Sequence, residues 1–197
     1  MSALSRGTDL WSATIAAVVP NFDATILTRH LRVVELSAGG VLLRAGTVAS
    51  GMWLLVDGAV RMSYYRRGRE HIGDFFLAGQ TCTDFSSLVT RSPSRLWLTA
   101  TEPTVVCELP WSAVEDATQR DLVGTERLRR VVAEGLTVEF AGRIWSSLMD
   151  TPAERYQTLL RERPQWFERF PQYMIASYLG LTPEGLSKLR RRLATGN

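Results

Sequence analysis

Residues 175–193 read IASYLGLTPEGLSKLRRRL and predict two short helices joined by a tight turn. Ala176 is small at the point where the two helices of a helix–turn–helix come closest. Gly180 lies where such a turn requires a positive φ, and Thr182 followed by Pro183 is typical of a helix start. The apolar positions recur at helical spacing: Ile175, Leu179, Leu181, Leu186 and Leu189. The pattern indicates a DNA-reading helix–turn–helix rather than a generic helical hairpin.

The second helix of such a motif enters the major groove, where its first residues meet the base edges. Lys188 can donate to guanine, and Glu184 can accept from cytosine. The basic end of the helix can neutralise phosphates, although a solvated helix end favoured by the helix dipole is the alternative explanation. The candidate DNA-contacting residues are Gln172, Tyr173, Thr182, Pro183, Glu184, Ser187, Lys188, Arg190, Arg191 and Arg192.

The distribution of charge agrees with this interpretation. The chain has a net charge of +3, but residues 1–150 carry 15 basic and 16 acidic groups. Residues 151–197 carry 8 basic and 4 acidic groups, so the positive excess lies at the end that holds the motif. A basic excess of this kind suits a polyanionic partner.

Composition places the chain among globular proteins. Its 197 residues are 45% hydrophobic with six Trp, which is enough for a core. No apolar run approaches the roughly 18 residues of a membrane span, and the N-terminus lacks the features of a secretory leader, so we expect a cytoplasmic protein. Cys82 and Cys107 make neither a disulfide framework nor a metal cluster, and we expect both to be buried thiols.

Residues 31–110 have the texture of short strands. The runs LRVVEL, VLLRA, MWLLV, AVRMSYY, HIGDFF, LWLTA and TVVCEL are separated by glycine-containing turns. Many short strands at this spacing predict an antiparallel sandwich or barrel. Asp57-Gly58 is a strong turn signal, and YYRRGRE predicts an exposed hairpin tip with Arg66, Arg67 and Arg69. Before these strands, residues 8–30 predict one or two short helices, with Thr8 or Ser12 as the cap.

Residues 121–149 predict one long helix with two apolar faces. One face follows alternating steps of three and four residues, which is typical of a coiled-coil seam: Leu128, Val131, Gly135, Val138, Gly142, Trp145 and Met149. The other steps by four: Val132, Leu136, Phe140, Ile144 and Leu148. Since a surface helix needs only one buried face, we expect one to pack on the chain's own sheet and the other on a partner. The alternative is a single deeply buried helix in a monomer.

The segment after this helix begins with a capping box. Thr151, Pro152 and Glu154 are the residues that such a box requires, and the helix they begin ends at Pro164. We expect residues 164–170 to be a short linker to the terminal helix pair.

Together these features resemble the Crp/Fnr family of bacterial transcription regulators. The resemblance rests on VLLRAGTVASGMWLLVDGAVRM, SRLWLTATEPTVVCEL and PQYMIASYLGLTPEGLSKLRRRL. It implies an α+β fold: an antiparallel β-roll (jelly roll) like a cyclic nucleotide-binding domain at 1–120, a long dimerisation helix at 121–150, and an all-α helix–turn–helix domain at 151–197. It also implies a homodimer on a pseudo-palindromic DNA operator, with RNA polymerase and an unknown small-molecule effector as further candidate partners.

The chain departs from this family in the phosphate-binding cassette. Members that bind cyclic nucleotides have a Gly-Glu pair and, after a loop, Arg followed by a small hydroxyl residue. Here Thr83-Asp84 replaces the first pair, and Ser94-Arg95 has the second pair in reversed order. Because a shift of one residue on a strand turns a side chain to the opposite face, we expect Arg95 to point away from the phosphate position. We therefore expect no control by a cyclic nucleotide, although Arg91 or Arg95 could bind another anion.

A second departure concerns the wing. Many members carry extra strands around the DNA-binding helices, whereas the residues before and after this helix pair leave no room for them. We therefore expect a wingless motif with fewer phosphate contacts.

Other classes of function are weaker. A small-ligand or protein-interaction sensor with a vestigial helix–turn–helix is the main alternative. An enzyme is not expected, because no catalytic constellation is present and His30 and His71 lack the clustered partners of a metal site. Either histidine alone could ligate haem, but a structural or exposed role is the simpler explanation. We expect no resident cofactor and no metal.

Overall fold

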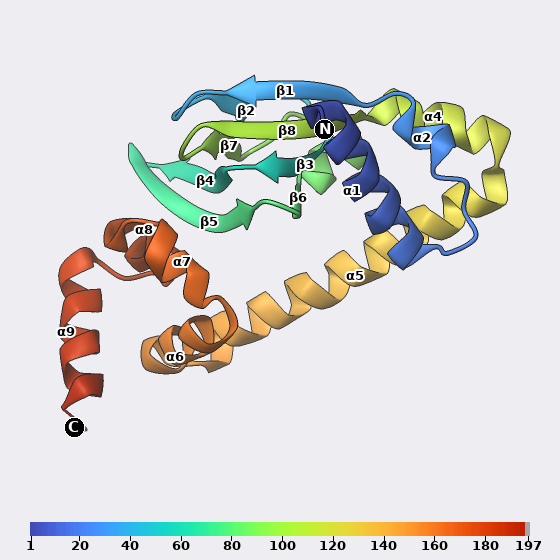
Figure 1. The fold of residues 1–197 in the computed structure, drawn as a ribbon. Helices are drawn as coiled ribbons and strands as arrows, with labels where there is room; N and C mark the ends of the chain where they lie inside the picture. Colours follow the sequence, from blue (N-terminus) through green and yellow to red (C-terminus); the bar gives the residue numbers. More distant parts are fainter. Residues whose placement is uncertain (196–197) are drawn as a thin grey trace.

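Two four-stranded antiparallel sheets form the β-roll of this computed structural model, which describes residues 1–195 (Figure 1). The strands of the first sheet, in spatial order, are β1 (Arg32–Leu36), β8 (Thr104–Pro110), β3 (Gly51–Asp57) and β6 (Thr81–Cys82). Those of the second are β2 (Val41–Leu43), β7 (Trp97–Ala100), β4 (Ala59–Arg66) and β5 (Arg69–Leu77). The α+β architecture predicted from the sequence is confirmed.

The core of the roll lies between the two sheets. Trp53 and Leu55 of β3 share one buried cluster with Val60 and Met62 of β4. The turn at Asp57-Gly58 is present, and Gly58 has a φ of 87°. The strands on either side of it do not pair, however, because the chain passes here from the first sheet to the second. The turn signal was therefore a corner of the roll and not a hairpin.

The N-terminal helix α1 (Ala3–Val18) packs on the first sheet. Trp11 of α1 is buried, and its indole Nε1–H donates to the Cys107 carbonyl oxygen at 2.9 Å. The side chain of Ser2 caps the helix by accepting from the Ser5 amide. The prediction that Thr8 or Ser12 caps this segment was wrong, because the helix already begins at Ala3. The remaining helices before the long one are α2 (Thr25–Thr28), α3 (Phe85–Thr90) and α4 (Trp111–Arg120).

The long helix α5 (Leu122–Met149) begins at Asp121, whose carboxylate accepts from the Gly124 amide at 2.8 Å. Thr125 is its only residue that is fully buried. Its exposed large apolar side chains are Leu122, Val123, Val138, Phe140, Ile144, Trp145, Leu148 and Met149. The alternative of a deeply buried helix in a monomer is therefore wrong. The expectation that one stripe packs on the chain's own sheet is also wrong for the C-terminal half of the helix, where both stripes are exposed.

Helix α6 (Pro152–Glu162) starts with the predicted capping box: Thr151 Oγ1 accepts from the Glu154 amide, and the Glu154 carboxylate accepts from the Thr151 amide at 2.7 Å. The segment that follows was predicted to be a linker, but it forms helix α7 (Pro164–Arg169). Pro164 begins this helix, and burial of Trp166 holds it in place. Helices α8 (Gln172–Tyr178) and α9 (Pro183–Ala194) complete the described chain. Residues 196 and 197, the end of the expected domain at 151–197, lie outside the described residues.

Helices α6 to α9 pack against the roll and share a buried core with it, beside β5 (Figure 1). Phe75 of β5 is 1% exposed and stacks on Phe170 with ring centroids 4.0 Å apart. Trp166 of α7 meets the Phe75 ring edge-on at 4.9 Å and is also 1% exposed. We call Phe75, Trp166, Phe170 and Tyr178 the docking cluster. It fixes the position of the helix pair relative to the sheets.

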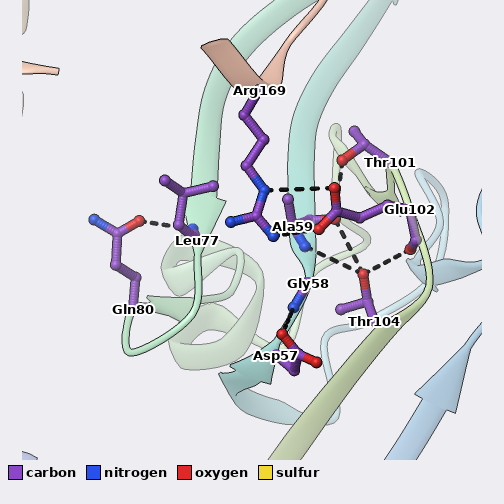
Figure 2. A network of polar contacts seen from close by, with 9 residues as sticks. All are labelled: Asp57, Gly58, Ala59, Leu77, Gln80, Thr101, Glu102, Thr104 and Arg169. Atoms are coloured by element: carbon purple, nitrogen blue, oxygen red, sulfur yellow. Dashed lines mark hydrogen bonds and ion pairs between the residues drawn. The ribbon is translucent and has the colours of Figure 1, made fainter. Parts of the chain in front are cut away.

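Polar contacts reinforce this docking. The Arg169 guanidinium of α7 forms an ion pair with Glu102, in the turn between β7 and β8 (Figure 2). Hydrogen bonding to Glu102 raises the pKa of Arg169. The turn is itself held to β4, because Thr101 and Thr104 both donate through Oγ1 to the Ala59 carbonyl oxygen at 3.2 Å (Figure 2). The side chains of Arg169 and Glu102 are each about one-third exposed, so we expect their ion pair to contribute less to stability than the buried aromatic rings.

A bulge in β5 at Gly73 joins three parts of the molecule. Arg143 of α5 donates to the Asp74 carboxylate at 2.6 Å and also to the Gly73 carbonyl oxygen. One residue earlier, the Ile72 amide donates to Ser177 Oγ of α8 at 3.0 Å. Burial raises the pKa of Asp74, while the nearby Arg143 charge lowers it. The roll, the long helix and the helix pair therefore meet within three residues of one strand.

Candidate nucleic-acid interface

The turn between α8 and α9 has the geometry that a helix–turn–helix needs. Gly180 has a φ of 72°, and its amide donates to the Ser177 carbonyl oxygen at 3.0 Å. The Leu181 amide donates to the Ala176 carbonyl oxygen at 2.8 Å, which completes a Schellman motif. Ala176 is fully buried, as expected for the close approach of the two helices. The predicted positive φ at Gly180 and the close helix approach at Ala176 are confirmed.

The second helix is capped at its start. Thr182 Oγ1 accepts from the Gly185 amide at 3.1 Å, and Pro183 occupies the first helical position. Leu186 and Leu189 are 1% and 4% exposed and anchor one face of α9 in the core. Because residues three and four apart share a helix face, the positions between these leucines point away from the core.

Every candidate DNA-contacting residue lies on the exposed part of this helix pair. The side chains of Glu184, Ser187 and Lys188 are exposed along the free face of α9, near its N-terminus. Arg190, Arg191 and Arg192 are exposed near its C-terminus. Gln172, Tyr173, Thr182 and Pro183 are exposed as well. All ten residues that the sequence singled out are thus exposed in the structure, on or between the two helices of the motif.

The degenerate cassette is closed by its own hydrogen bonds. Asp84 caps α3 by accepting from the Ser87 amide at 3.1 Å. Its other carboxylate oxygen accepts from Ser94 Oγ at 2.8 Å. Thr83 Oγ1 donates to the Gly51 carbonyl oxygen at 2.9 Å. Asp84 therefore places a carboxylate directly beside Ser94, and its negative charge would repel an anion at that point.

Neither cassette arginine forms an ion pair with Asp84 within residues 1–195. Arg91 is exposed, has a φ of 56°, and donates through Nη1 to the Ala49 carbonyl oxygen at 3.1 Å. Arg95 is exposed, whereas its neighbours Ser94 and Leu96 are buried. Residues 94–96 precede β7, so Arg95 is exposed in a loop and not through the strand alternation from which we predicted that it points away. The structure joins Asp84 to Ser94 and leaves both arginines exposed.

The remaining candidate ligands lie apart. His71 is exposed on β5, and His30 Nε2 accepts from Arg29 Nε at 2.9 Å. Within residues 1–195, no group of three or more His, Cys, Asp or Glu side chains is arranged to hold a metal ion. Both cysteines are buried; burial raises the pKa of Cys107 to about 11 and that of Cys82 still further. No helix in this described part of the chain is long and apolar enough to span a membrane.

Comparison with known proteins supports the same architecture. Residues 33–121 match the family model of the cyclic nucleotide-binding domain. FixK2 from Bradyrhizobium japonicum is 25% identical, with a TM-score of 0.69 over 84% of this chain and 85% of that one. A transcriptional regulator of the Crp/Fnr family from Eubacterium rectale is 14% identical, with a TM-score of 0.65 over 88% and 82% of the two chains. None of the curated proteins matches the chain in sequence.

Residues 33–121 therefore resemble the cyclic nucleotide-binding domain, and the chain as a whole has the fold of Crp/Fnr transcription regulators. The family resemblance predicted from the sequence is confirmed. A protein from Silicibacter pomeroyi described as a cAMP-binding regulatory protein also shares this fold, with 18% identity and a TM-score of 0.65 over 95% of this chain and 88% of that one. Fold similarity at that identity does not extend its ligand to this chain.

Proposed function

We propose that this protein is a homodimeric, DNA-binding transcription regulator whose roll is not controlled by a cyclic nucleotide. The observation that carries the proposal is the capped helix α9 with its free polar face. Glu184 and Lys188 lie one helical turn apart on that face, both exposed, where the reading helix of such a motif meets base edges. Arg190, Arg191 and Arg192 follow as phosphate-neutralising charges.

The homodimer is inferred from α5. Val138 and Trp145 are 74% and 68% exposed in the single chain, and both belong to the predicted coiled-coil seam. Gly135 and Gly142 on the same seam have no atoms near the place of a Cβ, so two helix backbones could approach closely there. A second copy of α5 is the natural partner, because a C2 dimer applies the same self-complementary face twice. Two copies of α9 would then read the halves of a pseudo-palindromic operator.

Independence from cyclic nucleotides is inferred from the Asp84–Ser94 pair. In the cassette, Ser94 Oγ already donates to a carboxylate, and the exposed Arg91 and Arg95 form no ion pair with it. An entering phosphodiester would have to break this bond and lie beside a negative charge. The sensor role of the roll, if any, would need another effector.

DNA binding is tested by fluorescence anisotropy on DNA from upstream of the protein's own gene, over a salt series, with scrambled DNA as control. We expect preference for the native sequence and a steep loss of affinity with salt. Lys188→Ala should relax the sequence preference by about 1–3 kcal/mol at its base pair, whereas Arg192→Ala should weaken all duplexes equally. Equal binding to native and scrambled DNA would leave the vestigial-motif alternative as the better account.

The dimer is tested by analytical ultracentrifugation of matched variants. Val138→Asp places a charge on the seam, and the adjacent Thr137→Asp places one on an exposed position outside it. We expect the first to dissociate the dimer and the second to leave it intact. Two dimeric variants would exclude this face of α5 as the interface.

Calorimetric titration with cAMP and with cGMP should give no binding heat; saturable binding would refute the cassette argument.

A further inference from the structure

The β4–β5 hairpin ends in a cluster of three arginines, Arg66, Arg67 and Arg69, which we call the arginine tip. All three are exposed, and none forms an ion pair in residues 1–195. The nearest acidic residue in sequence, Glu70, is paired instead with Arg61 at 2.9 Å. The tip is therefore a concentrated, uncompensated positive charge.

The tip is also held in a defined shape. Arg66 and Arg69 are the last cross-strand pair of the ladder, and Arg67 and Gly68 form the turn with φ angles of 51° and 76°. Two consecutive residues with positive φ are the signature of a tight type I′ hairpin turn, which matches the twist of the strands. An arginine is an uncommon residue in that conformation, because only glycine adopts it without a steric cost. Arg67 thus adopts a strained backbone conformation and adds a third positive charge to the tip.

The docking of the helix pair joins the strand that carries this tip to the helix that precedes α9. Ile72 of β5, three residues from Arg69, donates its amide to Ser177 of α8 and shares a buried cluster with Leu186 of α9. Three residues of strand span about 10 Å. In Figure 1 the hairpin tip and α9 both lie at the left of the molecule, with the tip above the start of α9. The buried leucines of α9 face the core, so its free face looks outward.

A duplex bound to α9 would extend beyond the groove that this helix reads. The major groove is about 12 Å wide, and a phosphate strand borders it on each side. Backbone phosphates therefore flank a helix in the groove on both sides. Within residues 1–195 no strand follows β8, so the helix pair has no strands of its own beside it. The roll supplies the nearest hairpin.

We propose that the arginine tip is a second DNA contact, which binds backbone phosphates flanking the half-site that α9 reads. Arginine suits this role because its guanidinium can engage two phosphate oxygens at once. The contact carries charge and register but no base sequence. This inference rests on the proposed DNA-binding function. It assigns to the sensor roll a direct part in affinity.

The test compares two variants that lose the same charge. Arg66→Gln/Arg69→Gln removes two tip charges without changing the turn residues, and Arg6→Gln/Arg120→Gln removes two exposed charges from α1 and α4. Affinity for native and scrambled duplexes is measured by anisotropy between 50 and 300 mM salt. In the tip variant, the slope of log K against log salt should fall by about 0.9 for each lost contact, or roughly 2 per half-site. Both duplexes should weaken by the same factor, and the control variant should keep the wild-type slope.

The outcomes separate the two proposals. If the wild-type protein binds no DNA, both the proposed function and this inference fail. If the wild-type protein binds DNA and both variants keep its slope of log K against log salt, only the inference fails. The arginine tip would then suit an acidic protein partner better than DNA. A tip variant that loses affinity for the native duplex alone would also overturn it, because that result indicates base readout. Thermal denaturation of both variants confirms that they are folded before binding is compared.

Discussion

Replacing Phe75 with alanine should release the helix pair from the roll. The Phe75 ring is 1% exposed and contacts Phe170 and Trp166 from the C-terminal helices. It belongs to β5, whose own ladder with β4 does not depend on that ring. We therefore expect the variant to keep the roll and to lose the docking.

The size of the effect follows from burial. A phenylalanine ring buries about 150–250 Å², which at about 25 cal/mol per Å² corresponds to roughly 4–6 kcal/mol. Measured truncations of buried phenylalanine cost about 3–5 kcal/mol. If about 4 kcal/mol of this falls on docking, the undocked population rises roughly a thousandfold, because every 1.4 kcal/mol is a factor of about ten.

Hydrogen exchange read by mass spectrometry measures this change. Peptides covering residues 164–179 should exchange faster in Phe75→Ala, and so should the Ile72 amide, whose hydrogen-bond partner is Ser177 of α8. The matched control is Phe76→Ala, because Phe76 points to the opposite face of β5 and packs on the core of the roll. That variant should loosen the roll and not α7 or α8. If Phe75→Ala leaves the exchange of residues 164–179 unchanged, the docking cluster is not what holds these helices.

Three further changes test other parts of the fold. Gly180→Ala forces an L side chain to a φ of 72° and should cost about 1 kcal/mol or more in a urea titration; an unchanged midpoint would contradict the turn geometry. Cys107 should resist iodoacetamide at pH 8 in the native state, because its pKa is raised to about 11, and should react on unfolding; rapid native labelling would show that this site opens. The pKa of Asp74 is raised by burial, so its contribution to stability is present in full below its ordinary pKa of 3.8 and is lost as pH rises through the folded value. Asp74→Asn should remove that loss and flatten the pH profile of unfolding free energy, whereas an unaltered profile would refute it.

The contacts at the β5 bulge could couple a change in the roll to the position of the helix pair. Arg143 of α5 contacts Asp74, and Ser177 of α8 contacts Ile72, so both helices are bonded to the same short stretch of β5. A change in the roll that moved this bulge would alter the contacts of the long helix and of the helix pair together. Such a shared element is what a two-state regulator requires, because its arrangement can be biased from either side.

Local patterns were predictable because their causes are local. The capping box at Thr151, the turn at Gly180 and the start of α9 at Thr182 each depend on residues within five positions of one another. The ten candidate DNA-contacting residues were therefore found together without the structure, because they lie on two adjacent helices.

Tertiary structure alone decided how these parts fit together. Ile72 and Ser177 are 105 residues apart, and nothing in the pattern of either segment indicates that they meet. Residues 164–170 read as a linker because two prolines bound a short aromatic run; only burial of Trp166 and Phe170 against Phe75 makes it a docked helix. Likewise, the bond between Asp84 and Ser94 depends on the fold of the cassette and not on either residue type. Sequence periodicity records which face of an element is buried, but the surface that covers that face is chosen by the packing of the whole chain.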